Sequence, residues 1–97
     1  MKILTEKDVF KKEGLYKFVR VKGEYRFLNA DSCSPPTHKQ MLQDGEVAEA
    51  AGTAGVTFEA RYWKMFDNYS STLNVFAGQE DEKRLTVIFG CPLKEDY

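Results

Sequence analysis

Three short features of the sequence carry residue types that could act on an anion, and the first is His38. It is the single histidine of the chain, and it follows two prolines near the start of a predicted helix whose inner face also carries Met41 and Leu42. An imidazole titrates near neutral pH, and the unpaired amide N–H groups at a helix start attract anions. His38 could therefore exchange a proton with a bound phosphate. The alternative is a surface or half-buried histidine with a backbone partner.

The second feature is Lys17, which interrupts an apolar stretch from Leu15 to Val21. If its side chain faces a cleft, the ammonium group can neutralise an oxyanion. If the strand lies at the edge of a sheet, the lysine instead prevents edge-to-edge aggregation, and Arg20 on the opposite face could serve in the same way. The sequence leaves both interpretations open.

The third feature is the stretch DNYSSTL, residues 67–73. Ser70, Ser71 and Thr72 supply hydroxyl groups, and a bent backbone can aim successive N–H groups at one anion. Asp, Asn and Ser are also the standard residues of turns, because their side chains bond nearby backbone groups. The composition therefore predicts a turn, with an anion-binding loop as the alternative.

Composition excludes several classes of function. The chain has fourteen Lys and Arg residues and fifteen Asp and Glu residues, which gives a net charge of −1. It therefore lacks the excess of basic residues expected of a nucleic-acid-binding protein. No apolar core of a signal peptide follows Met1, and no apolar stretch approaches the ~20 residues that span a bilayer. We therefore expect a soluble cytoplasmic protein with neither a nucleic-acid nor a membrane partner.

Metal and cofactor binding are not expected either. Cys33 and Cys91 lie far apart and form no CxxC pair, which favours two free thiols in a reducing compartment over a single disulfide between them. With one histidine and two isolated cysteines, no zinc-type spacing is present. No Walker or GxGxxG motif indicates a nucleotide. We expect no metal and no cofactor.

Periodicity and capping signals predict the order of the structural elements. The expected elements are a helix over 5–12, strands over 15–21 and 25–28, a helix from Pro35 to Gly45, a small-residue strand over 46–58, strands over 62–66 and 73–76, and a helix over 79–89. Gly52 and Gly55 interrupt the small-residue strand and indicate a bulge. The last element also has strand-like composition, but the helix is favoured, with Leu85, Ile88 and Phe89 facing inward.

These elements predict an α+β fold. We expect residues 1–97 to form a single small domain, in which a mixed β-sheet is flanked by two or three helices.

The order of the three features resembles the Janus/Ocnus family, whose best-known members are the small phosphohistidine phosphatases. A strand reading GLYKFV (residues 14–19) precedes the histidine at a helix start, a small-residue strand follows, and a later strand leads into NYSSTL (residues 68–73). The resemblance covers roughly residues 14 to 90, and its motifs are short. It implies a mixed sheet flanked by helices and a metal-independent phosphatase activity.

The resemblance also implies roles for particular residues. Lys17 would steady the phosphate, and His38 would act as the acid–base or nucleophilic group. The backbone N–H groups that would cradle the anion belong to Lys39, Tyr69, Ser70 and Ser71. The implied partner is a phosphorylated protein or a small phosphorylated ligand.

The chain departs from the family at three places. The glycine-rich run is reduced to AAGTAG (residues 50–55), Asn68 stands where the family has a loop glycine, and Pro-Pro-Thr precedes His38. These departures leave a second function open, because a fold does not fix a function. That function is a non-catalytic interaction domain with exposed aromatic residues and the segment NADSCSPP (residues 29–36) as its binding face. The oligomeric state is left open, a homodimer included.

Overall fold

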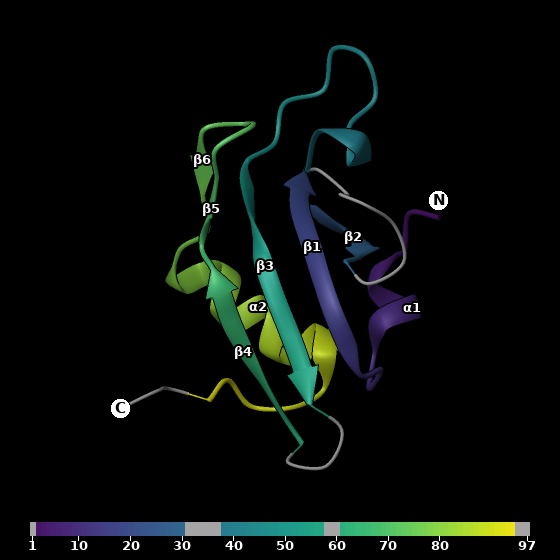
Figure 1. Ribbon diagram of the computed structural model, residues 1–97, viewed down its shortest axis with the longest axis vertical. Coiled ribbons are helices and arrows are strands. Elements are labelled where there is room, and N and C mark those ends of the chain that lie inside the picture. The colour runs from purple at the N-terminus through teal and green to yellow at the C-terminus, as the bar shows by residue number, and fades with distance from the viewer. Residues whose placement is uncertain (1, 31–37, 58–60, 95–97) are drawn as a thin grey trace.

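The computed structural model describes residues 2–30, 38–57 and 61–94. Its elements (Figure 1) are α1 (Glu6–Val9), β1 (Gly14–Val21), β2 (Glu24–Asn29), the 3-10 helix η1 (His38–Met41), β3 (Ala50–Thr57), β4 (Tyr62–Asp67), β5 (Tyr69–Ser70), β6 (Val75–Phe76) and α2 (Gln79–Phe89). The expected α+β class is confirmed.

The main sheet has four strands in the order β2-β1-β3-β4, and β5 and β6 form a second, two-stranded sheet. All pairings between these strands are antiparallel. Within the described ranges, the one parallel pairing is an isolated bridge between Trp63 and Leu93. The expected sheet flanked by helices is therefore present, but its strands are antiparallel where a mixed sheet was expected.

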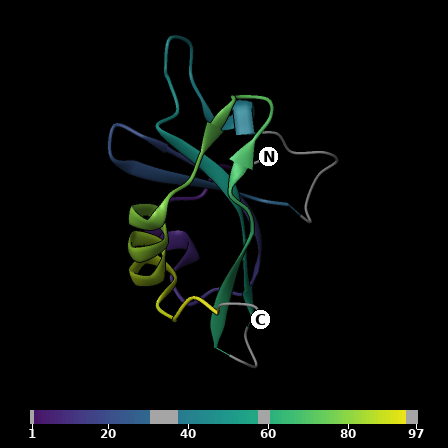
Figure 2. The ribbon, with the colours of Figure 1, turned by 90° about the vertical axis from the view of Figure 1, so that its left-hand side faces the viewer.

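The two faces of the main sheet pack against different elements. On one face, called the α2 face here, aromatic side chains of the sheet meet α1 and α2, which lie together on one side of the sheet (Figure 2). This cluster includes Tyr16, Phe18, Phe27, Trp63, Leu85 and Phe89. The opposite face, called the η1 face, packs against η1 and the β5–β6 hairpin. Its cluster includes Val19, Val21, Leu28, Met41, Ala48 and Ala51, with Leu73 and Val75 against it.

Helix α2 confirms the predicted last helix. The Asp81 carboxylate accepts a hydrogen bond of 2.9 Å from the backbone N–H of Gly78 and so satisfies an open amide before the first turn. Gly90 ends the helix in a left-handed conformation, with φ of 74°. Leu85 and Phe89 are fully buried, and Ile88 packs against the same cluster. Burial of this face outweighs the strand-like composition.

Helix α1 is shorter than the predicted helix over 5–12. The predicted capping box is present, since the Thr5 backbone N–H donates to the Asp8 carboxylate at 2.8 Å. Lys11 then takes a left-handed conformation with φ of 55°, and its N–H donates to the carbonyl of Phe89 at 3.0 Å. This contact with the end of α2 stops the helix before Gly14.

The predicted helix from Pro35 to Gly45 is wrong over its described part. Residues 35–37 lie outside the described residues, and the next four form the single turn of η1. The Glu46 carboxylate accepts hydrogen bonds from the Gln43 backbone N–H, at 2.7 Å, and from Arg26 of β2, at 2.6 Å. These contacts hold the chain in a turn where a helix would have continued. His38 and Met41 are nevertheless buried together, as the pattern predicted.

The small-residue strand starts later than expected, at Ala50 rather than at residue 46, and Phe58 lies outside the described residues. An irregularity is present between the two glycines, because the register with β4 shifts between Thr53 and Ala54, but the extra residue belongs to β4 rather than to the small-residue strand. A Cβ atom at Gly52 would come within 2.6 Å of the Asp67 carbonyl oxygen. A glycine therefore allows the end of β4 to lie close against β3.

Candidate functional site

His38 opens η1 and is buried, with 5% of its surface exposed. Its Nε2 atom lies 2.7 Å from the carbonyl oxygen of Gly52 in β3. A carbonyl can only accept a hydrogen bond, so Nε2 carries the proton in this contact. The neutral ring therefore has its lone pair on Nδ1, and the contact fixes both the tautomer and the position of the ring.

The pKa of His38 is lowered below its usual value of 6.5, chiefly because burial disfavours the charged ring. The Gly52 carbonyl opposes this shift, the charge of Lys17 adds to it, and the charge of Asp67 opposes it. His38 is thus neutral at pH 7, and Lys17 and Asp67 are near enough to act on its titration.

Lys17 is half-buried in the middle of β1. It stands opposite Leu28 of β2 and Thr53 of β3, and Thr53 in turn stands opposite Asp67 of β4. Strand alternation places Lys17 on the same face as Val19, which belongs to the η1 cluster. Lys17, Thr53 and Asp67 therefore form a row across three strands on the face where η1 lies.

This position decides between the two interpretations of Lys17. Strand β1 is interior to the sheet, with β2 on one side and β3 on the other. Neither Lys17 nor Arg20 therefore protects a sheet edge. Arg20 instead forms ion pairs with Asp81 at 2.6 Å and with Glu49 at 3.2 Å.

The stretch over residues 67–73 runs from Asp67 at the end of β4 through β5 into the turn of the β5–β6 hairpin. The Tyr69 N–H donates to the Asp67 carboxylate at 3.0 Å, and the Leu73 N–H donates to the Ser70 hydroxyl at 3.3 Å. The Tyr69 hydroxyl donates to the Asn74 side chain at 2.8 Å. The prediction of a turn is confirmed for residues 71–73, whereas residues 69–70 form a strand that pairs with β6. One of the four amides predicted to hold an anion, that of Tyr69, already has a carboxylate as its acceptor.

The other predicted cradle residues lie in different environments. Lys39 and Ser71 are exposed, Tyr69 is half-buried, and Ser70 is buried with 2% of its surface exposed. Strand β3, which carries Gly52 and Thr53, lies against both β5 and β6. The hairpin thus flanks the same strand that His38 contacts.

Asp67 and Thr53 are the members of this row that sequence reasoning missed. Asp67 is the first residue of the 67–73 stretch and has the composition of a turn residue, which is also its role toward Tyr69. Thr53 is the single polar side chain in the alternating run of alanine and glycine. The residue type of Thr53 could therefore have singled it out in the sequence. The sheet face on which Asp67 lies depends instead on the register shift beside it, which the sequence does not reveal.

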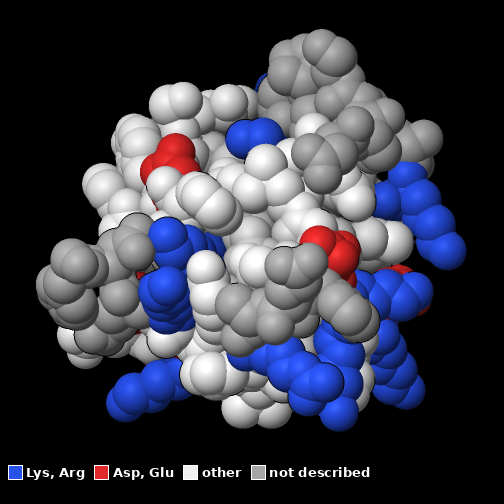
Figure 3. Space-filling model, turned by 60° about the horizontal axis from the view of Figure 1, so that its bottom comes forward, with Lys and Arg blue, Asp and Glu red and all other residues white. Residues whose placement is uncertain are grey.

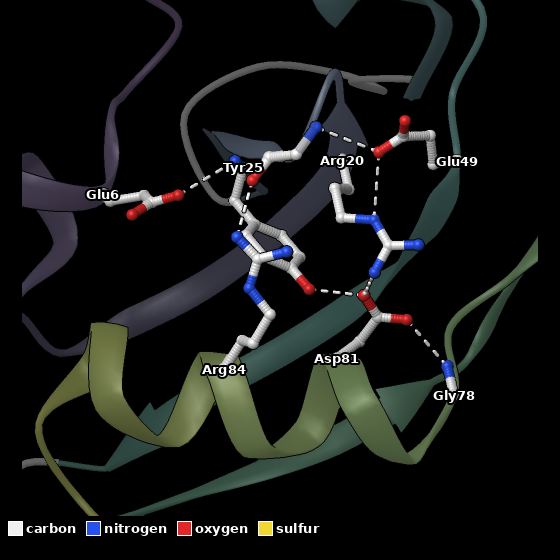
Figure 4. A network of polar contacts seen from close by, with 8 residues as sticks. Glu6, Arg20, Tyr25, Glu49, Gly78, Asp81 and Arg84 are labelled. Carbon is white, nitrogen blue, oxygen red and sulfur yellow. Dashed lines mark hydrogen bonds and ion pairs between the residues drawn. The ribbon is translucent and has the colours of Figure 1, made fainter.

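A second polar cluster lies on the α2 face (Figure 4). The buried Asp81 carboxylate accepts from Arg20, from the Tyr25 hydroxyl and from the Gly78 N–H. The pKa of Tyr25 is raised, chiefly by burial of its hydroxyl group and next by the contact with Asp81. Arg84 stacks over the Tyr25 ring with 4.9 Å to its centroid. Because both Asp81 oxygens have protein donors, this cluster fixes α2 to the sheet rather than offering a ligand site.

The end of the molecule where β3 finishes carries a cavity of about 370 Å³, and lysine and arginine side chains gather there (Figure 3). Lys11, Arg61 and Cys91 are among its lining residues. Cys91 is a free thiol, as expected, and burial raises its pKa. A raised pKa makes a thiol less reactive. Cys33 lies outside the described residues.

In the described part of the chain, no group of three or more His, Cys, Asp or Glu residues could hold a metal ion. No helix in the described ranges has the length and apolar character to cross a membrane. Most of the segment proposed as an interaction face, residues 31–36, lies outside those ranges.

No protein-family model, no curated protein and no solved structure matches the chain. The resemblance to the Janus/Ocnus family therefore stays a prediction.

Proposed function

We propose that the chain binds a phosphorylated protein or a small phosphorylated ligand on the η1 face and hydrolyses its phosphoryl group without a metal ion, in the manner that the resemblance to phosphohistidine phosphatases implies. The observation that carries the proposal is the placement of a buried, neutral His38 on the same sheet face as Lys17. In this proposal Lys17 neutralises the phosphoryl oxygens.

The tautomer of His38 defines its part in the reaction. With the proton of Nε2 donated to Gly52, the lone pair on Nδ1 is the reactive one. As a general base, Nδ1 accepts a proton from water while the water oxygen bonds to phosphorus, the bond to the leaving group breaks, and the leaving group takes up that proton. As a nucleophile, Nδ1 bonds to phosphorus while the bond to the leaving group breaks and the leaving group takes up a proton from solvent; a water oxygen then bonds to phosphorus, the Nδ1–P bond breaks, and phosphate is released. Both routes require a neutral ring.

The test is hydrolysis of phosphoramidate by the wild type and by two variants. His38→Ala removes both ring nitrogens, whereas His38→Gln retains an N–H that can donate to the Gly52 carbonyl. We expect both variants to lose at least about a hundredfold in rate, as removal of a general base does. His38→Gln should retain the wild-type unfolding midpoint. Equal rates in the wild type and His38→Gln would exclude His38 from catalysis.

One observation favours a second candidate, a non-catalytic interaction domain. The Asp67 carboxylate occupies the Tyr69 amide, and the Ser70 hydroxyl accepts from Leu73, so these groups of the turn are already satisfied. An anion would have to displace Asp67 from Tyr69 before using that amide. Titration with inorganic phosphate, followed by amide NMR, separates the candidates. Shifts at Lys17, His38 and Tyr69 support the phosphoryl site, and their absence at millimolar phosphate supports the interaction domain.

A further inference from the structure

An open groove of about 500 Å³ lies on the sheet beside the row of Lys17, Thr53 and Asp67. Leu15, Gly55, Phe66 and Glu13 are among its lining residues. Most of its lining residues come from the start of β1, the end of β3 and the end of β4. The groove therefore continues the proposed phosphoryl site along the strands.

The strand register fixes the distance between the groove and the site. Leu15 stands opposite Gly55, and Lys17 stands opposite Thr53. The two pairs are neighbours on one face of the same two strands, so they are separated by two residues, or about 7 Å. That distance matches the length of an aromatic ring attached to a phosphoryl group.

Phe66 gives the groove an aromatic wall. A Cβ atom at Gly55 would come within 2.3 Å of the Phe66 ring, so the ring lies directly on the strand backbone. Phe66 is nevertheless 64% exposed. An exposed ring held against a glycine can pack against a second ring without a change in the fold.

We propose that this groove receives the ring of a phosphotyrosine carried by a segment of a partner protein, while Lys17 and His38 face its phosphoryl group. The inference rests on the proposed function, because the phosphoryl site sets where the ring must lie. The openness of the groove favours a protein segment, since pockets for small molecules enclose most of their ligand. A phosphoserine would leave the groove empty, because its phosphate sits next to the backbone.

The test compares two peptides that differ only in the phosphorylated residue, Gly-Gly-pTyr-Gly-Gly and Gly-Gly-pSer-Gly-Gly, by titration calorimetry. We expect the phosphotyrosine peptide to bind the wild type at least about tenfold more tightly, which corresponds to burial of a ring. Phe66→Ala should reduce this preference to less than about threefold. Phe76→Ala is the matched control, because Phe76 is also 64% exposed but is not among the lining residues of the groove. It should keep the full preference.

Amide NMR of the wild type provides a readout that needs no variant. The phosphotyrosine peptide should shift Leu15 and Gly55 in addition to Lys17, whereas inorganic phosphate should shift Lys17 without them. Equal affinity for the two peptides, or a preference that survives Phe66→Ala, would overturn the inference. Phenyl phosphate binding as tightly as the peptide would overturn its assignment to a protein segment. If neither peptide nor inorganic phosphate binds, the proposed function fails as well.

Discussion

The two faces of the main sheet are covered by elements of different lengths. The eleven-residue helix α2 lies on one face and buries an aromatic cluster. The Asp81 carboxylate of this helix is also buried on that face, and both of its oxygens accept hydrogen bonds from protein groups. On the other face lie a four-residue 3-10 turn and a hairpin of two-residue strands. Short elements cover little apolar area, so this face keeps Lys17 and Thr53 half-buried. The α2 face therefore supplies most of the buried aromatic core, and the η1 face leaves room for polar groups near a ligand.

The largest effect should follow from emptying the centre of the α2 face. Phe89 is fully buried, and its ring lies 5.4 Å from that of Trp63 and 5.6 Å from that of Phe27, measured between centroids. We expect Phe89→Ala to lower the free energy of unfolding by about 4 kcal/mol, from lost burial and the cavity left behind. Urea unfolding measures this. The control on the same helix is Val87→Ala, whose side chain is 74% exposed; it should change the free energy by less than about 0.5 kcal/mol.

The next effect should come from the Asp81 cluster. In Asp81→Ala, Arg20 and Tyr25 lose a shared buried acceptor and the Gly78 N–H loses its cap. We expect the free energy of unfolding to fall by about 3 kcal/mol, which is a small loss for a broken buried ion pair. The loss is limited because the Arg20 side chain keeps some contact with solvent. Glu80→Ala, an exposed neighbour, should stay within about 0.5 kcal/mol. A similar small change for both variants would mean that the cluster does not fix α2.

The difference between the faces also explains which elements could be predicted. Helix α2 could be read from its acidic first turn, its inward Leu85 and Phe89, and Gly90, because these are local signals. The turn after η1 could not be read in this way. The same proline and glycine signals fit a helix, and what prevents one is the contact of Glu46 with Arg26, twenty residues earlier in the chain. A tertiary contact overrode the local pattern.

The candidate site was predictable in part for a similar reason. His38 and Lys17 could be selected by residue type and by their positions near a helix start and within an apolar strand. Asp67 could not, because alternation from Trp63 would place it on the α2 face. The register shift between Thr53 and Ala54 adds one residue to β4 and turns Asp67 toward Thr53. A shift of one residue reverses the face of a side chain, and no pattern in a single sequence locates it.

A smaller effect, on binding rather than on stability, should follow from changing Lys17. Lys17→Met retains most of the apolar stem and removes the charge, so phosphate affinity should fall about tenfold, or about 1.4 kcal/mol. The free energy of unfolding should change little. Lys12→Met is the control, because Lys12 is exposed and precedes β1, and it should alter affinity by less than about twofold. Equal losses in both variants would indicate general charge attraction, and a loss in neither would remove Lys17 from the site.

The smallest effect is a change in the titration of His38, which tests whether the charges of Lys17 and Asp67 act on this ring. The chain has one histidine, so its ring protons give a single NMR titration. The pKa should lie below 6.5 in the wild type, because burial disfavours the charged ring. Lys17→Met removes a repelling charge and should raise the pKa, whereas Asp67→Asn removes an attracting one and should lower it. Unchanged values in both variants would show that these charges do not reach His38.

The same titration predicts a dependence of stability on pH. The pKa of His38 is lower in the folded protein than the value of about 6.5 in the unfolded chain, so the unfolded chain takes up the proton first as the pH falls. The contribution of His38 to stability is therefore complete above pH 6.5, is lost as the pH decreases toward the folded-state pKa, and is constant below it. Urea unfolding of the wild type and of His38→Gln, which has no titrating ring, measures this contribution. The two free energies of unfolding should agree above pH 6.5, and that of the wild type should fall below that of the variant as the pH decreases. A wild type that instead gains stability relative to the variant as the pH falls would mean that folding raises the pKa of His38.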